Sequence, residues 1–382
     1  MNETMHAPII SDAQRMAARR ILAINVTRIG DTLLNTPALR ALAAFFPHAA
    51  ITCLGHAKRV EVIAHLPYLT KVGAIDKRSA LWRGWARGWT NSFNGPRFDW
   101  AFVWGHDRAL QKYALRVADK VIAYRQSDEA LSRKLFCAAD EPRLYSRHGV
   151  AMQMALTEGA GIPAAGYQLD YVVTHAETEA ARARLILDIE SGRRPLIGLQ
   201  VTSFPTKAYR DWPIAQFIDL AKRIIRTHHS AHFVLFGGPD DRESTGQFQR
   251  ALPEHTTVYA GRLSLRETVA IMKEIDLYIG VDTGPTHLFG ALGKPMVALY
   301  HPSLPSGLYK PLQHPALYVV DHPAAGPGAD QHIAMAGISV DMVWARVADA
   351  LTGRPSRYPG MPAVGIVPDP SLQPPLRSRE AM

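Results

Sequence analysis

The sequence RILAINVTRIGDTLLNTPALRAL, from Arg20 to Leu42, decides the fold because an apolar strand, a turn and a helical pattern follow one another. Arg20–Val26 is a short apolar run of the kind that lies inside a parallel sheet. The same order returns in the second half of the chain, where the apolar run Pro195–Val201 also precedes a polar loop and a helical pattern. The repetition predicts two similar halves.

Further strand-like runs alternate with helix-period segments along the chain. The strand-like runs are Ile51–Leu54, Trp100–Trp104, Lys120–Ala123, Ala231–Phe236, Asp276–Gly280 and Pro295–Tyr300, and the helical segments include Pro37–Phe46, Ile214–Arg226 and Ser264–Lys273. Apolar strands that alternate with helices indicate parallel sheets covered on both faces. We therefore predict an α/β protein with two Rossmann-like domains.

The length of 382 residues also favours two domains, because one ordinary core rarely grows so large. We expect the first domain at residues 1–175 and the second at 176–337, followed by a closing helix at 338–352 that Ser339 caps. Residues 353–382 contain seven prolines and no apolar period, which predicts a disordered tail.

Composition and termini predict a cytoplasmic globular protein. Hydrophobic residues make up 47% of the chain and charged residues 20%. The two cysteines, Cys53 and Cys137, are too few for a disulfide framework or a cysteine-rich zinc site, which indicates a reducing compartment. The first twenty residues lack the apolar core of a signal peptide, and no run approaches the roughly 18–20 apolar residues that cross a bilayer.

The formal net charge of +9 is unevenly distributed, since residues 77–150 carry 14 Lys/Arg and 7 Asp/Glu. This excess favours an anionic partner such as a nucleic acid, a membrane surface or a phosphorylated substrate. Nucleic acid is the least favoured of the three, because the sequence contains no recognised nucleic-acid-reading module.

Within this basic region, LWRGWARGW at residues 81–89 spaces its tryptophans by three and four. On a helix they share one face, and tryptophan with arginine suits a membrane interface or an anionic glycolipid. The alternative is that the tryptophans belong to the core and the glycines mark a loop. Together with one residue of the first turn, the acceptor- and membrane-facing candidates are Arg28, Trp82, Arg83, Trp85, Arg87 and Trp89.

Asp31 has two interpretations. It can be a structural acid that satisfies free N–H groups at a helix start. However, Thr36 followed by Pro37 is a better helix start, which would leave Asp31 on the connecting segment at the carboxyl end of the strand. Open α/β sheets bind ligands at that position, so the second interpretation is a functional carboxylate.

Three loops of the second half also follow predicted strands. Gly280–His287, GVDTGPTH, opens a helix where N–H groups and the dipole suit a phosphate, although an Asx turn with a packed histidine fits as well. Thr202–Pro213 carries hydroxyls, Lys207 and Arg210 that can hold a diphosphate, unless it is a solvated loop. Phe236–Glu243 offers acids for ribose hydroxyls or for capping a helix.

The first half of the chain argues against a dinucleotide dehydrogenase. The turn after its first strand, Thr27–Asp31, has no G-x-G-x-x-G pattern, and the second strand ends at Gly55 without an acid for a ribose. The three loops together suit a nucleoside diphosphate. The donor-binding candidates are Thr202, Ser203, Arg210, Gly237, Asp241, Glu243, Asp282, Thr283, Gly284 and His287.

The chain resembles the family 9 glycosyltransferases, the heptosyltransferases of lipopolysaccharide core assembly. The motif R-I-G-D-x-x-x-x-x-P-x-L-R-A-L at Arg28–Leu42 and D-T-G-P-T-H at Asp282–His287 carry the resemblance. The motifs F-G-G-P-D-D-R-E at Phe236–Glu243 and R-D-W-P at Arg210–Pro213 add to it, and the likeness covers roughly residues 20–350.

The resemblance implies a GT-B fold, with the acceptor on the first domain and an ADP-heptose donor on the second. It implies inversion at the sugar, no metal ion and no cofactor beyond the nucleotide-sugar. The family's conserved acid falls on Asp31 as general base, and its helix-start residues fall on Asp282 and Thr283. The expected acceptor is an anionic glycolipid, met at the inner face of the cytoplasmic membrane.

Two departures from the family pattern stand in the donor loops. The position of the family's usual diphosphate lysine holds Arg210, while Lys207 lies three residues earlier; either can serve, and we favour Lys207 as the catalytic cation. Residues 300–305, YHPSLP, lack the acid that family members often carry there, so the donor sugar stays open. The alternatives are a transferase with another donor or acceptor, a nucleotide-sugar epimerase, and a non-catalytic protein that binds anionic lipid.

Overall fold

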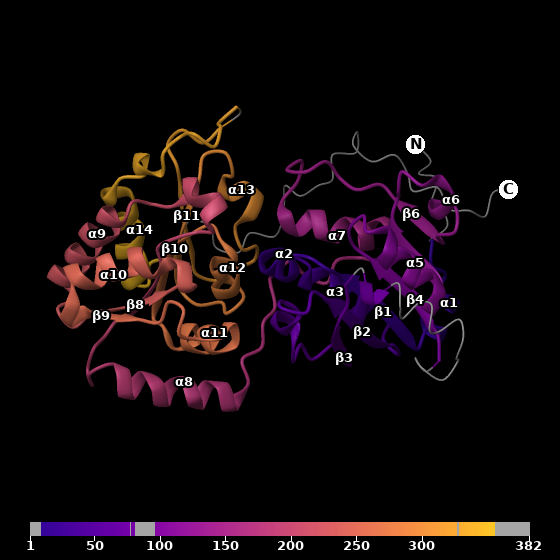
Figure 1. Ribbon diagram of the computed structural model, residues 1–382, viewed down its shortest axis with the longest axis horizontal. Helices are drawn as coiled ribbons and strands as arrows, with labels where there is room; N and C mark the ends of the chain where they lie inside the picture. Colours follow the sequence, from indigo (N-terminus) through magenta and orange to yellow (C-terminus); the bar gives the residue numbers. More distant parts are fainter. Residues whose placement is uncertain (1–8, 77, 81–95, 327, 356–382) are drawn as a thin grey trace. The chain divides into compact units, whose positions relative to one another are not determined.

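The computed structural model describes residues 9–76, 78–80, 96–326 and 328–355 (Figure 1). The tryptophan segment at 81–89 and residues 356–382 of the expected tail lie outside these ranges. The described chain divides into two compact units, the first ending at Asp170 and the second beginning at Tyr171. Each unit contains one six-stranded sheet in which every pairing is parallel, which confirms the predicted fold class.

The first sheet has the strand order β3-β2-β1-β4-β5-β6. Its strands are β1 Arg20–Asn25, β2 Ala50–Gly55, β3 Lys71–Ala74, β4 Phe98–Val103, β5 Ala118–Tyr124 and β6 Cys137–Ala139. Its helices are α1 Asp12–Ala17, α2 Ile29–Leu34, α3 Thr36–Phe45, α5 Arg108–Val117, α6 Glu129–Ser132 and α7 Gly149–Gly159, with the 3-10 turn η1 Val60–Ile63.

The first core explains why β1 reads as an unbroken apolar run. Leu22 and Ile24 join a buried cluster with the inner side of α5, where Leu110 and Val117 pack. The intervening residues of β1 are equally buried, because helices cover both faces of a parallel sheet. The central strand is therefore held rigidly, and so is the loop at its carboxyl end.

The second sheet has the strand order β12-β11-β10-β7-β8-β9. Its strands are β7 Leu196–Gln200, β8 His232–Phe236, β9 Thr256–Val258, β10 Leu277–Val281, β11 Met296–Tyr300 and β12 Leu317–Asp321. Its helices are α8 His175–Asp188, α9 Ile214–Thr227, α10 Arg242–Ala251, α11 Leu265–Glu274, α12 Gly284–Gly290, α13 Ser306–Tyr309 and α14 Val340–Leu351, with 3-10 turns η2 Pro205–Arg210, η3 Pro239–Asp241, η4 Pro253–His255 and η5 Met335–Gly337.

Two buried clusters cover the two faces of the second sheet. One includes α9 and α14, and Trp212 joins it by donating its indole N–H to the Ile338 carbonyl oxygen at 2.8 Å. The other includes Ala181 and Leu185 of α8, with Ile271 of α11. Ser339 caps α14 by accepting a hydrogen bond from the Met342 N–H, as expected from the sequence.

One expected helix boundary is wrong. Of the two positions that the sequence left open for Asp31, a helix start and a connecting segment, the structure shows the first: Asp31 lies in the first turn of α2. Thr36 is the first residue of α3, and its hydroxyl donates to the Leu33 carbonyl oxygen at 2.7 Å. The reason is that two short helices follow each other directly through Asn35, so Thr36 lies within a helical corner and cannot cap its own helix.

Both sheets reverse their strand order at one point, between β1 and β4 in the first and between β7 and β10 in the second. Open α/β sheets bind ligands at the carboxyl ends of the strands beside such a point. No helix in the described ranges is both long and apolar enough to cross a bilayer.

Candidate active site

Asp31 lies just beyond the carboxyl end of β1, at the reversal point of the first sheet. Its carboxylate accepts a hydrogen bond from the Thr27 hydroxyl at 3.2 Å, and its second oxygen has no partner within the described residues. Arg59 supports the same turn by donating to the Thr27 carbonyl oxygen at 3.0 Å. The half-buried carboxylate is thus oriented through one oxygen, while the other oxygen is available to accept a proton, as a general base requires.

The other predicted residues of the first unit add little to this turn. Arg28 precedes α2 with an exposed side chain, and its carbonyl oxygen accepts a hydrogen bond from the Thr32 N–H at 2.9 Å. Trp82, Arg83, Trp85, Arg87 and Trp89 lie outside the described residues.

Asp282 is the most buried acid among the candidate residues of the second unit. It follows β10 directly, and only 4% of its surface is exposed. An Arg210 guanidinium nitrogen lies 3.6 Å from one carboxylate oxygen, and His287 Nε2 lies 3.6 Å from the other. Burial raises the pKa of Asp282, while the nearby His287 and Arg210 oppose that rise.

The start of α12 is held by hydroxyls beneath it. The buried Thr286 hydroxyl contacts the Tyr278 hydroxyl at 3.0 Å and donates to the Val281 carbonyl oxygen at 2.5 Å. Thr283 precedes the helix in extended conformation without capping it, and its hydroxyl donates to Val281 at 3.3 Å. The Gly284 N–H therefore lies in the first turn, while Pro285 has no N–H to offer.

Internal hydrogen bonds fix the conformation of the loop after β7. Ser203 donates its N–H to an Asp211 carboxylate oxygen and its hydroxyl to the Lys207 carbonyl oxygen, both at 2.7 Å. The Thr202 hydroxyl is buried and has no hydrogen-bond partner within the described residues. Burial raises the pKa of Asp211, and the hydrogen bonds from Ser203 oppose that rise.

The two candidate cations of this loop, Lys207 and Arg210, both lie near the ring of Tyr209. Lys207 Nζ lies 5.7 Å and Arg210 Cζ lies 5.5 Å from the centre of that ring. Arg210 Nε also donates to the Tyr209 hydroxyl at 3.3 Å, and the His301 ring meets Tyr209 edge-on at 5.0 Å. Of the two cations, Arg210 is the one that reaches Asp282.

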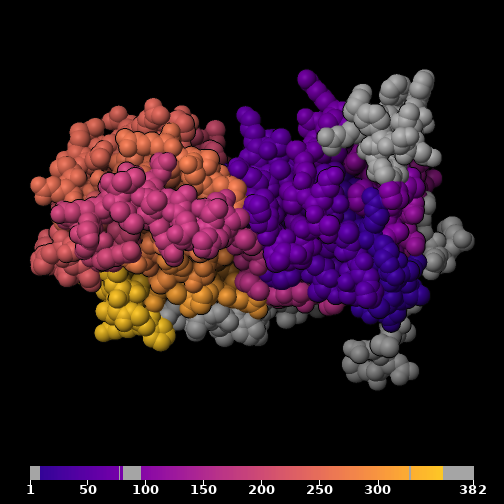
Figure 2. Space-filling view, turned by 90° about the horizontal axis from the view of Figure 1, so that it is seen from below, coloured from indigo at the N-terminus to yellow at the C-terminus, as the bar shows by residue number. Residues whose placement is uncertain are grey.

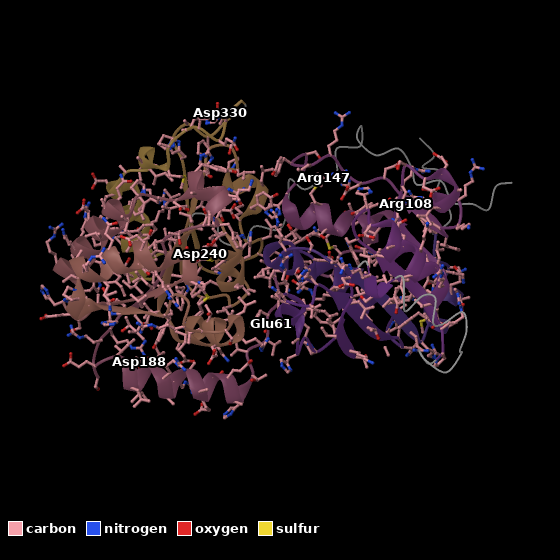
Figure 3. The ribbon with its side chains drawn as sticks, in the orientation of Figure 1. Glu61, Arg108, Arg147, Asp188, Asp240 and Asp330 are labelled. Atoms are coloured by element: carbon pink, nitrogen blue, oxygen red, sulfur yellow. The ribbon has the colours of Figure 1, made fainter. Side chains whose placement is uncertain are left out.

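One acid of the loop after β8 is hydrogen-bonded to the backbone of the same loop. Asp241 accepts a hydrogen bond from the Gly238 N–H at 2.6 Å, and Gly237 adopts a φ of +153° beside that carboxylate. Glu243 is exposed and lies 3.7 Å from Arg250 of the same helix. Asp240 is exposed and has no partner within the described residues, which makes it the free acid of this loop (Figure 3).

Gly237→Ala is expected to destabilise the protein by about 1–3 kcal/mol. A Cβ at this position would lie 2.6 Å from an Asp241 oxygen, and the positive φ disfavours any L side chain. Urea unfolding measures the change. The matched control is Gly307→Ala, where a Cβ meets nothing within 4 Å and no positive φ is required; equal losses in both variants would contradict this account.

Tyr300 and His301 are buried residues that sequence reasoning singled out only as a departure from the family. Burial raises the pKa of Tyr300, and its hydroxyl has no hydrogen-bond partner in the described chain. His301 Nε2 contacts the Ile333 carbonyl oxygen and Nδ1 contacts the Ser303 hydroxyl, each at 2.8 Å. Burial is the main cause that lowers the pKa of His301, so its ring is neutral at pH 7.

Three neighbouring strands of the second sheet, β11, β10 and β7, thus end in buried polar atoms that lack a hydrogen bond within the described residues. These atoms are the Tyr300 hydroxyl, one Asp282 oxygen and the Thr202 hydroxyl. Unpaired buried polar groups are costly, and a bound ligand or water can complete their hydrogen bonding. Across the described ranges, no three His, Cys, Asp or Glu side chains form a group that could hold a metal ion.

Comparisons with known proteins agree with this architecture. Lipopolysaccharide heptosyltransferase 2 of Salmonella typhimurium is 26% identical over 310 residues, which cover 78% of this chain and 86% of that protein. The crystal structure of a family 9 glycosyltransferase from Veillonella parvula aligns with a TM-score of 0.75 at 22% identity, covering 88% of this chain and 98% of that one. The E. coli ADP-heptose lps heptosyltransferase II aligns with a TM-score of 0.71 at 21% identity, covering 87% and 99%.

The structural likenesses show that the fold is of the GT-B type. The model of "Glycosyltransferase family 9 (heptosyltransferase)" matches residues 117–332, more than half of the chain. The resemblance seen in the sequence motifs is confirmed: the chain belongs to glycosyltransferase family 9 and is a glycosyltransferase.

Proposed function

We propose that this chain transfers a heptose from ADP-heptose to a hydroxyl of the lipopolysaccharide inner core, with inversion at the anomeric carbon and without a metal ion. The observation that carries the proposal is the set of buried, unpaired polar atoms at the ends of β7, β10 and β11, beside Arg210. The relatives described above include a lipopolysaccharide heptosyltransferase 2 and the E. coli ADP-heptose lps heptosyltransferase II, which supports the choice of sugar.

In the proposed reaction, Asp31 takes the proton of the acceptor hydroxyl while that oxygen attacks the anomeric carbon. The bond between that carbon and the diphosphate oxygen breaks, and its electron pair leaves with ADP. General-base assistance of this kind contributes roughly 10²–10⁴ in rate. The Thr27 hydroxyl, 3.2 Å from one carboxylate oxygen, holds Asp31 in place.

The departing diphosphate gains negative charge, which Lys207, Arg210 and the Gly284 N–H would stabilise. The two cations share the Tyr209 ring, so their positions are coupled. Asp282 and His287 would orient sugar hydroxyls. Thr202, Ser203, Gly237 and Thr283 would shape the loops around the nucleotide, and the acids at 240, 241 and 243 are the candidates for the ribose.

Calorimetric titration with ADP, UDP and GDP tests the donor. We expect ADP to bind at least about tenfold more tightly than UDP or GDP, with an affinity that EDTA leaves unchanged. A preference for UDP or GDP would contradict the donor, and a loss of binding on chelation would contradict metal independence. Absence of binding by all three would contradict a nucleoside diphosphate site at the ends of these strands.

We further propose that the first unit meets an anionic glycolipid at the cytoplasmic face of the membrane. The support lies in the loop between β6 and α7, where the Leu144 side chain is 70% exposed and Tyr145 is 49% exposed. Arg143 and Arg147 flank them, and Arg147 is labelled in Figure 3. Apolar tips between arginines suit a lipid interface.

Leu144→Glu is expected to weaken binding to vesicles that contain an anionic lipid at least about tenfold, because a carboxylate replaces an inserting side chain. Vesicle co-sedimentation measures it. The control is Met16→Glu, which changes another exposed apolar side chain of the first unit and should bind as the wild type does. Unchanged binding of the Leu144 variant would contradict the assignment.

A further inference from the structure

Helix α8 has one buried side, which holds it firmly on the second unit. Thr178, Ala181 and Leu185 are buried, and Leu185 belongs to the cluster that contains Ile271 of α11. A capping box fixes its start, where the Thr174 N–H donates to Glu177 at 2.8 Å. The helix is thus well anchored, and its opposite side faces solvent.

The outward side of α8 is also apolar. Ile186 and Leu187 are 78% and 85% exposed, the highest values among the large exposed hydrophobic side chains of the described residues. Leu187 shares its stripe with the exposed Ala176, Ala180 and Ala183, because the spacings of four, three and four keep them on one side of a helix. Figure 2 shows α8, in magenta-pink, on the surface of the second unit that faces the viewer. Burying an exposed Leu or Ile contributes roughly 1.5–3 kcal/mol.

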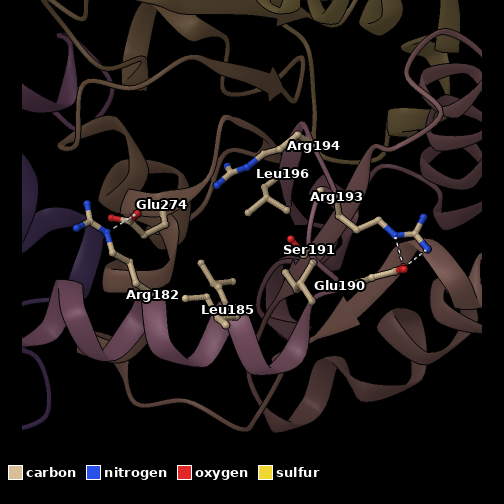
Figure 4. A pocket seen from close by; sticks show the side chains of 11 residues that line it. Arg182, Leu185, Glu190, Ser191, Arg193, Arg194, Leu196 and Glu274 are labelled. Carbon is tan, nitrogen blue, oxygen red and sulfur yellow. Dashed lines mark hydrogen bonds and ion pairs between the residues drawn. The ribbon is translucent and has the colours of Figure 1, made fainter.

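A pocket lies on the inner side of α8, between the helix and the body of the second unit, and none of the stripe residues lines it (Figure 4). It has a volume of about 360 Å³, and Leu185, Ile189 and Leu196 contribute apolar lining. The arginines around it are each matched by an acid, as in the pairs Arg182–Glu274, Arg193–Glu190 and Arg194–Asp276 at 3.0, 2.9 and 2.9 Å. The arginines of α8 itself are matched as well, Arg182 by Glu179 and Glu274 and Arg184 by Glu267 at 3.9 Å. This balance of charge disfavours an anionic lipid surface as the partner of the outward side.

We propose that the outward side of α8 binds α8 of a second copy of this chain, in an antiparallel pair with two-fold symmetry. The stripe is self-complementary about one point, midway between residues 181 and 182. Reversal about that point places Leu187 opposite Ala176 of the second copy, and Ala183 opposite Ala180. A large side chain thus meets a small one at each end, and two small ones let the helices approach closely at the centre.

The charges beside the stripe select the same arrangement. Glu179 lies 3.2 Å from Arg182 along one edge of α8, and both side chains are about half exposed. Arg182 also contacts Glu274 of α11 through its Nε at 3.0 Å, so its other guanidinium nitrogens are the ones that can meet a second copy. In the antiparallel pair this edge meets itself in reverse, so Glu179 lies beside Arg182 of the second copy and four charges form one alternating network. A parallel pair would instead bring Arg184 beside Arg182 of the second copy, which is repulsive.

Analytical ultracentrifugation of the full chain over a range of concentrations tests the proposal. We expect a reversible dimer whose dissociation constant rises at least about tenfold in Leu187→Glu, because the change places a carboxylate against an apolar stripe. The control is Leu144→Glu, which changes another exposed leucine, in the first unit. This variant should dimerise as the wild type does. A chain that is monomeric at every concentration would overturn the proposal.

A charge swap separates pairing from misfolding. Glu179→Lys and Arg182→Glu should each weaken the homodimer, because each sets like charges together across the two-fold axis. A mixture of the two variants should recover dimers, since the lysine introduced in one variant then meets the glutamate introduced in the other, and the native Arg182 and Glu179 that remain meet each other. Failure of the mixture to recover dimers would overturn the antiparallel pairing. These measurements need no substrate, so their outcome is independent of the transferase assay.

Discussion

Asp31→Asn should lower kcat by about 10²–10⁴ while leaving the affinity for ADP within about twofold. The amide cannot take the proton of an acceptor hydroxyl. Its oxygen can still accept the hydrogen bond that Thr27 donates to Asp31 at 3.2 Å, so the turn before α2 should persist. The measurement is the steady-state release of ADP from the nucleotide-sugar in the presence of acceptor, combined with calorimetric binding of ADP.

The matched control is Asp12→Asn, in the same unit. Asp12 is 91% exposed and, among the residues that the structure describes, pairs only with Arg15 of its own helix, so this variant should retain turnover. Turnover near the wild-type value in Asp31→Asn would contradict the role of Asp31 as general base. Loss of ADP binding in that variant would instead place Asp31 in the donor site.

Arg210→Met should lower kcat by about 10²–10³ and weaken ADP binding as well. The guanidinium is one of two cations held on the Tyr209 ring, and it is the one that lies 3.6 Å from Asp282. Its loss removes charge stabilisation of the leaving diphosphate and also leaves a buried carboxylate with one neighbour fewer. Lys207→Met should have the smaller effect, because Lys207 has no such second role.

We also expect the stability loss of the Arg210→Met variant to depend on pH. Burial raises the pKa of Asp282 above its ordinary value of 3.8, and Arg210 opposes that rise. A raised pKa in the folded state means that stability is fully present below the ordinary value and is lost as pH rises through the folded pKa. Arg210→Met raises that pKa further, so its deficit in unfolding free energy should be larger at pH 7 than near pH 4.

Urea unfolding at the two pH values measures this deficit, with Lys222→Met as the control. The Lys222 side chain is 54% exposed on α9, and its ion pair within the described part of the chain is with Asp219, at 3.9 Å. The control should lose neither turnover nor stability at either pH. A pH-independent deficit in Arg210→Met would contradict the pairing with Asp282, and full turnover in that variant would assign the diphosphate to Lys207.

The central strands of both sheets were predictable from sequence because their apolar runs are unbroken. β1 and β10, for example, are buried along nearly their whole length, and helices cover both faces. The edge strands β3, β6, β9 and β12 were not predicted. They are three to five residues long, and short apolar runs cannot be assigned by periodicity alone.

The loops of the candidate site were predictable in position but not in internal contacts. Strand ends indicated where Asp31, Asp282 and the cations would lie, since parallel strands bring their carboxyl ends to one edge. Which acid stays free depends on side-chain geometry: Asp241 is occupied by the Gly238 N–H, whereas Asp240 is open. The role of Tyr209 was not predicted either, because the spacing of Lys207 and Arg210 does not show that both cations lie near the same ring.

The most direct test of the central claim is a transfer assay with the purified full chain, ADP-heptose and a lipopolysaccharide inner-core acceptor that lacks this sugar. We predict ADP release that depends on the acceptor, an acceptor mass increased by one heptose, and an inverted anomeric centre in the product. Release of ADP without any acceptor product, or retention of anomeric configuration, would contradict the account.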